Sequence, residues 1–172
     1  MRRRIKLALY LTIIAFVGLN STETAAQTYT SQLQQGIGLY NSGMYSHAQE
    51  ILEGMLKETG DENIWGNKAG DKAVAEGYIL LCKFASQYPN MQGELNRYLE
   101  LYPHSPIADN VKMGGADYHF ANEKYVEANT LISSINPKSL DKKSHMEYQF
   151  KKGYCHFRIG ELEQAQEVFR SI

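Results

Sequence analysis

The sequence lacks three features that would each have indicated a class of protein. Its longest apolar run covers about 13 residues, Leu7 to Leu19, whereas a membrane-spanning helix needs roughly 20. After residue 26, no segment carries charge of one sign clustered enough for a membrane-surface or polyanion site. No segment shows sustained strand alternation. These absences disfavour a spanning protein, a polyanion-binding protein and a β-fold.

The short apolar run has the flanks of a secretory signal peptide. Basic residues occupy positions 2–4 and 6, and small or polar residues continue to Ala26. This pattern predicts a signal peptide over residues 1–26 and an exported chain after it; a membrane anchor is the weaker alternative. No cysteine stands near the junction, which argues against a lipoprotein. Removing the segment's four basic residues and one acidic residue from totals of 18 and 19 leaves a net charge of about −4, which offers nucleic acid no general attraction.

Cysteine is scarce as well. The only two are Cys82 and Cys155. A pair in an exported protein can form a disulfide. Both lie among apolar residues in helical patterns, however, which favours two small buried side chains.

What the chain does contain is helical periodicity in almost every segment after the signal peptide. Proline, glycine and asparagine interrupt the pattern repeatedly, which predicts short turns between helices. The expected helices cover residues 29–42, 45–58, 69–86, 91–101, 106–121, 124–136, 142–159 and 161–172. One longer connection, 58–71, is rich in glycine and charge. The sequence therefore predicts an all-α fold built from helical hairpins.

The hairpins share a spacing of small residues. Three second helices open with the segments Gly43-x-Tyr45-x-x-Ala48, Glu123-x-Tyr125-x-x-Ala128 and Gly160-x-Leu162-x-x-Ala165. A small residue stands twelve positions before each alanine, at Gly36, Ala116 and Gly153. Because a larger side chain would hold crossing helices apart, each small residue is expected to contact its alanine. A further unit between the first two matches has no such residues and is inferred from the spacing alone.

This pattern resembles the tetratricopeptide repeat (TPR) family. The residues that carry the signature roles are Gly36, Gly43, Tyr45, Ala48, Leu52, Ala116, Tyr125, Ala128, Ile132, Pro137, Gly153, Gly160, Ala165 and Phe169. The resemblance covers about residues 29–172, in units of about 29–60, 69–103, 106–138 and 142–172. The spacing departs from the usual length of about 34 residues, and the early tryptophan is absent. The resemblance implies a right-handed α-α superhelix of about four hairpins, each covered by its neighbours.

A turn between units strengthens the link to exported proteins. Tyr102-Pro103-x-Ser105-Pro106 is similar to the inter-repeat turn of exported bacterial TPR proteins, such as the outer-membrane assembly lipoproteins and the periplasmic cell-division coordinators. Here Ser105 is expected to cap the next helix and Pro106 to occupy its first position. The resemblance implies a periplasmic or envelope-associated protein.

No group of residues is arranged for catalysis. Gly36-x-Gly38 has no strand before it, and segment 60–72 lacks the spacing of a phosphate loop. His119 and His156 lie 37 residues apart at equivalent repeat positions, which favours a packing or groove role over a metal site. We expect no enzyme activity, cofactor or metal.

The first helices would line the inner face of a TPR superhelix. Their inner positions would be Leu33, Ile37, Tyr40, Asn41, Leu80, Lys83, Phe84, Met113, Asp117, Phe120, Phe150, Tyr154, Phe157 and Arg158. The predicted partner-binding groove consists of Tyr40, Asn41, Lys83, Asp117, Phe120, Tyr154 and Arg158. An aromatic groove with a few charges suits an extended peptide or a partner helix. The resulting prediction is a non-enzymatic protein-interaction scaffold of the bacterial cell envelope. The alternatives are a component that binds an envelope glycan or polymer, an outer-membrane assembly component, or aromatics that only pack between repeats.

The C-terminal segment predicts missing partners. Residues 161–172 have the pattern of the start of a repeat's second helix, with Ala165, Phe169 and Ile172 on apolar positions. Repeat arrays normally finish with a polar capping helix. We therefore expect either a longer repeat protein or an open end that docks another copy or another chain.

Overall fold

A computed structural model describes residues 29–58, 69–140 and 142–172. The predicted signal peptide lies outside these residues, as does most of the 58–71 connection. Within the described ranges the chain is helical and contains no strand, which confirms the all-α prediction. The helix boundaries agree with the predicted ones to within three residues.

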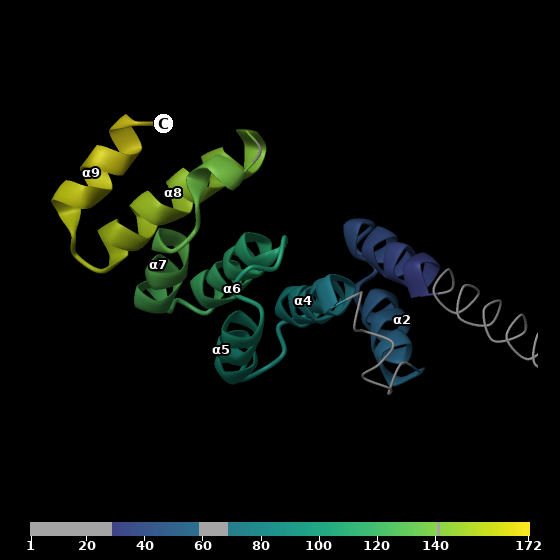
Figure 1. The fold of residues 1–172 in the computed structure, drawn as a ribbon. Helices are drawn as coiled ribbons and strands as arrows, with labels where there is room; N and C mark the ends of the chain where they lie inside the picture. The colour runs from purple at the N-terminus through teal and green to yellow at the C-terminus, as the bar shows by residue number, and fades with distance from the viewer. Residues whose placement is uncertain (1–28, 59–68, 141) are drawn as a thin grey trace, which may run out of the picture.

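The helices form four consecutive hairpins. Hairpin one pairs a helix over residues 29–41 with α2 (Tyr45–Glu58), and hairpin two pairs α4 (Ala69–Ala85) with α5 (Gln92–Leu101). Hairpin three pairs α6 (Ala108–Ala121) with α7 (Tyr125–Ser133). Hairpin four pairs α8 (Lys142–Arg158) with α9 (Leu162–Arg170). A 3₁₀ turn, η1 (Pro137–Ser139), precedes α8. Figure 1 shows the hairpins following one another across the molecule in chain order.

The first helix of every hairpin ends in the same way. Gly43, Gln87, Glu123 and Gly160 have φ values of 76°, 55°, 58° and 87°. In each case the next amide donates to a carbonyl five residues earlier, as when Met44 N–H bonds to the Leu39 oxygen at 2.9 Å. This is the Schellman helix end, which requires a left-handed residue and therefore favours glycine. The signature glycines thus have a conformational reason.

In hairpins one, three and four the residue after this turn also starts the second helix. The carbonyls of Met44, Lys124 and Glu161 accept hydrogen bonds at 3.0 Å from the amides of Ala48, Ala128 and Ala165. The alanines are 0%, 0% and 3% exposed. The three-unit alignment made from the sequence therefore corresponds to one repeated backbone geometry.

At Gly36 and Gly153 the nearest atoms belong to the residue one turn after the predicted alanine partner. A Cβ added at Gly36 would lie 2.5 Å from Leu52 Cδ2, and one at Gly153 would lie 2.7 Å from Phe169 Cε1. Leu52 and Phe169 each stand four residues after the alanine of the same hairpin. The reason is the side-chain direction, because helical side chains lean back toward the preceding turn. Gly36 and Gly153 therefore accommodate a large side chain of the facing helix.

Hairpin two departs from this geometry. Three extra residues, 88–90, separate its left-handed Gln87 from the start of α5, where the Leu95 amide donates to the Met91 carbonyl. Leu95 therefore occupies the place that alanine holds elsewhere. Leu80 occupies the place of Gly36, seven residues before the turn. Both leucines are buried, and α5 stays farther from α4 than the second helices stay from the first in hairpins three and four.

The turn before α6 was predicted incorrectly in detail. The helix starts at Ala108 with Ile107 as its N-cap, and no side chain caps it. The Tyr98 hydroxyl donates its one proton to the Ala73 carbonyl at 3.0 Å, so the Ser105 hydroxyl, 2.9 Å away, donates to Tyr98, while Ser105 Oγ accepts from the Ile107 amide at 3.4 Å. The hydrogen bond from Tyr98 to Ala73 therefore links α5 to α4, and the one between Tyr98 and Ser105 links the turn to α5.

Packing between hairpins produces three apolar clusters. The first joins Leu33, Leu52 and Met55 of hairpin one to Ala75 and Ile79 of α4. The second centres on α4, α5 and α6, and the third joins hairpin three to α8. Each core is therefore shared by consecutive hairpins, as in repeat proteins.

Candidate functional site: the face of the first helices

Tyr40 is the predicted groove residue of hairpin one that the structure places deepest. Its ring centroid lies 5.5 Å from that of Tyr45 and 5.2 Å from that of Tyr78 on α4. Burial raises the pKa of Tyr40 to about 12, and nearby groups, including the Asp117 carboxylate, add to the shift. The Tyr40–Tyr78 contact joins the first helices of hairpins one and two. Asn41, the next residue, is exposed.

The two charged groove residues of the middle hairpins are engaged in ion pairs. Lys83 Nζ lies 2.7 Å from Glu94 Oε2, which links α4 to α5. Lys151 Nζ lies 2.6 Å from Asp117 Oδ1, which links α8 to α6. Burial raises the pKa of Asp117, and the hydrogen bond from Lys151 opposes this increase. The second pair therefore ties the first helices of hairpins three and four together at the groove.

The remaining predicted residues form one aromatic cluster. The Tyr154 ring on α8 lies 5.3 Å from that of Phe120 and 5.9 Å from that of Tyr125. Arg158 Nη1 donates to the hydroxyls of Tyr125 and Tyr154 at 2.8 and 3.2 Å. The guanidinium carbon of Arg158 stands 4.2 Å from the Tyr125 centroid, within cation–π distance. The Tyr125–Tyr154 contact joins hairpins three and four, whereas Tyr45 contacts Tyr40 of its own hairpin.

Several other positions predicted on the inner face lie in the cores instead. Leu33, Leu80 and Phe84 are 5%, 4% and 3% exposed, so a partner cannot reach them. Helical spacing gives the face of a helix, but it cannot show where the neighbouring hairpin covers that face. Ile37 and Met113 are half-buried, whereas Phe150 and Phe157 are exposed.

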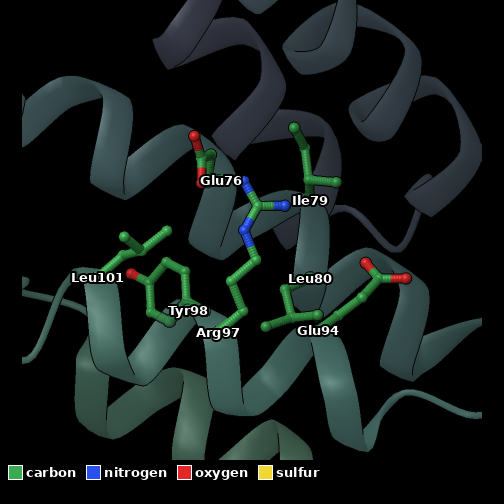
Figure 2. Close-up of a pocket in the computed structure, with 7 residues that line it drawn as sticks. All are labelled: Glu76, Ile79, Leu80, Glu94, Arg97, Tyr98 and Leu101. Carbon is green, nitrogen blue, oxygen red and sulfur yellow. The ribbon is translucent and has the colours of Figure 1, made fainter.

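A small open pocket between α4 and α5 was missed by the sequence analysis. Its volume is about 120 Å³, and it is lined by Glu76, Ile79, Leu80, Glu94, Arg97, Tyr98 and Leu101. In Figure 2 the Arg97 guanidinium points toward Glu76 and Ile79. Ligand pockets typically measure about 300 Å³ or more, so this one accommodates at most a single side chain or a few waters. Hairpin two lacks the signature residues, so no signal in the sequence placed Arg97 beside α4.

Nucleophilic chemistry has little support among the described residues. Cys82 and Cys155 are free and buried, as predicted. Burial raises the pKa of each thiol to about 11, which disfavours the reactive thiolate. The described residues contain no group of three or more histidine, cysteine, aspartate or glutamate side chains placed to hold a metal ion.

The equivalent histidines have different surroundings. His119 is 2% exposed, and its Nδ1 finds no hydrogen-bond partner within the described ranges. Burial lowers its pKa. His156 Nδ1 instead lies 2.6 Å from Glu161 Oε2. Equal repeat position therefore does not give the two rings an equal role.

Comparison with the models of known protein families, with curated proteins and with solved structures finds no match. Across the part of the chain that the structure describes, no helix combines the length and the apolar character needed to cross a membrane. The arrangement of the first helices is therefore the main basis for a functional proposal.

Proposed function

We propose that the chain is an exported, non-enzymatic scaffold of the bacterial cell envelope that binds a peptide or a partner helix along the face of its first helices. The four hairpins would form a right-handed TPR-like superhelix, and this face would be its concave side. The repeated left-handed turns, and the equivalent hydrogen bonds of the three alanine amides, support the TPR-like interpretation. The signal-peptide pattern of residues 1–26 supports export.

One observation carries the proposal. The Tyr40 ring packs against that of Tyr78 on α4 at 5.2 Å, and Asp117 of α6 pairs with Lys151 of α8 at 2.6 Å. These contacts between the first helices of consecutive hairpins support a shared face. Phe120, Tyr154 and Arg158 continue that face. Arginine and tyrosine are among the residues enriched at the energetic centre of protein interfaces.

Arg158 places a positive charge on this face. Its Nη1 donates to two tyrosine hydroxyls, which hold the guanidinium plane over the Tyr125 ring. A guanidinium fixed in this way loses little freedom when it binds a carboxylate through two parallel hydrogen bonds. The preferred peptide would therefore carry an acidic side chain beside an apolar one.

Glycan binding remains the alternative, with tyrosine rings as stacking surfaces. The ring contacts count against it, because Tyr40, Tyr78 and Tyr154 already pack against other rings. The same consideration does not bear on an assembly role at the outer membrane, which would also use protein partners.

The test is a peptide library displayed on phage, selected on residues 27–172 and counter-selected on the double variant N41R/R158E. Both substituted residues are exposed, so the fold should be retained. We expect peptides with an acidic residue that bind the unsubstituted chain and lose about tenfold in affinity on the variant. Equal affinity for both chains, or displacement by envelope glycans, would refute the peptide groove.

A further inference from the structure

His119, near the end of α6, is a buried histidine with one ring nitrogen unpaired. It is 2% exposed, and its Nδ1 has no hydrogen-bond partner among the described residues. A protonated imidazole carries two N–H donors, so protonation would leave a donor of a charged group buried and unpaired. Removing such a group from water without a hydrogen bond costs free energy. The closed hairpin therefore accommodates the neutral ring and disfavours the charged one.

Hairpin four shows which partner hairpin three lacks. His156 occupies the position of His119, 37 residues later, and its Nδ1 lies 2.6 Å from Glu161 Oε2. The residue equivalent to Glu161 is Lys124. Both residues have φ −86° and ψ 69°, and the amide of each donates to the carbonyl of its own histidine at 2.9 Å. On the same backbone, a cation therefore replaces the carboxylate that the other repeat places beside its histidine.

The charges around His119 do not compensate for its burial. Among the described residues, the charged groups that act on the ring are Glu127 of α7 and Lys124, and none belongs to α4, α5 or α8. Burial lowers the pKa of His119, the Glu127 carboxylate opposes this effect, and Lys124 adds to it. Because the folded-state pKa is lowered, the stability that the neutral ring contributes is present above its ordinary pKa of about 6.5 and is lost as the pH falls through the folded value.

The ring lies at the turn that joins α6 to α7. The His119 carbonyl accepts hydrogen bonds from the amides of Asn122 and Lys124 at 3.1 and 2.9 Å. The next residue, Phe120, packs against Tyr125 with ring centroids 5.5 Å apart. In a repeat array the stability of each unit comes from its own contacts and those with its neighbours, so one hairpin can open while the others stay folded.

We propose that hairpin three is a pH-sensitive joint of the array: uptake of a proton by His119 in mildly acidic solution opens the turn between α6 and α7, while the equivalent turn of hairpin four stays closed. The inference concerns the fold and does not depend on the peptide groove. Lys124 determines the direction of the response, since a carboxylate at that position would bond the protonated ring, as Glu161 does in hairpin four.

The test is hydrogen–deuterium exchange of residues 27–172 at pH 7.5 and pH 5.5, with each protection factor calculated from the intrinsic exchange rate at that pH. We expect protection in peptides that cover residues 117–131 to fall about five- to tenfold at pH 5.5. The reason is that one pH unit below 6.5 the histidine of the open form is protonated about ten times as often as it is neutral. Peptides that cover residues 154–168 of hairpin four should keep their protection.

Lys124→Glu is the decisive variant, because it places the arrangement of hairpin four on the same backbone in hairpin three. It should abolish the fall, as should His119→Phe, which removes the titrating group. The matched control is Lys138→Glu, which makes the same change in net charge at an exposed position at the other end of hairpin three, and should retain the fall. Lys124 is exposed as well, so both lysine variants should fold.

Three results would overturn the inference. The first is an equal loss of protection in all four hairpins, since the histidine would then titrate only with global unfolding. The second is a fall that His119→Phe leaves unchanged. The third is a fall that Lys124→Glu leaves unchanged, because the missing carboxylate would then not be the cause.

Discussion

The left-handed turn at Glu123 is the best place to test the repeat geometry. Gly43 and Gly160 occupy the same position in hairpins one and four, with φ values of 76° and 87°, whereas Glu123 adopts 58° with a side chain. An L-residue in this region costs roughly 1–2 kcal/mol. Glycine avoids that cost but loses about 0.4–1 kcal/mol more backbone entropy on folding. Glu123→Gly should therefore stabilise the chain by about 0.5–1 kcal/mol, or roughly 1–4 °C in Tm.

The measurement is urea unfolding of residues 27–172 followed by circular dichroism at 222 nm. Glu123 also places a negative charge near Arg158, so the control is Glu123→Ala, which removes the carboxylate but keeps the β-carbon. Alanine should bring no gain, and Gly160→Ala should cost about 1 kcal/mol as the reverse substitution. If Glu123→Gly and Glu123→Ala shift the midpoint equally, the effect is electrostatic and the backbone reasoning is wrong.

Three further predictions concern packing and titration. Gly36→Ala should destabilise the fold by about 1–3 kcal/mol in urea unfolding, because the added methyl group meets the fully buried Leu52. Gly153→Ala should cost less, because Phe169, which its methyl group meets, is 41% exposed and can move. Burial lowers the folded-state pKa of His119, so the stability it contributes is present above pH 6.5 and is lost as the pH falls through the folded pKa; unfolding midpoints between pH 8 and 5 should decline less steeply in the His119→Phe variant. Cys82 and Cys155 should react with a thiol reagent at pH 8 far more slowly in the native chain than in denaturant; equally fast labelling in both conditions would contradict their burial.

Three of the four hairpins could be predicted from the sequence because their geometry depends on side-chain size. A left-handed turn favours glycine, and a close helix crossing excludes large residues. Small residues therefore recur at a fixed spacing that is recognisable in the sequence. Gly36, Gly153 and the buried alanines at 48, 128 and 165 are such positions. The exact partner of each glycine could not be predicted, since it depends on the lean of side chains in the facing helix.

Hairpin two did not match the repeat pattern of the other three hairpins, for a physical reason. Its left-handed residue is Gln87 rather than glycine, and an insertion of three residues shifts the next helix. Leu80 and Leu95 replace small residues, and the wider separation of α4 and α5 accommodates them. The hydrogen bonds of Tyr98 to Ala73 and Ser105 then hold α5 in place. Nothing local in the sequence shows that a wider crossing is stabilised in this way.

Exposure was the property that the sequence could predict least, and the two faces of the repeat show why. Phe120 and Phe157 are the same residue type at the same repeat position, yet Phe120 packs against Tyr154 of the next hairpin while Phe157 is 54% exposed. Ile135 and Ile172 differ in the same way, at 4% and 55%. Periodicity specifies which side of a helix is apolar, but burial depends on a neighbour that the helix does not encode. The groove of the first helices is therefore the part of this pattern where covering hairpins leave polar and aromatic groups accessible.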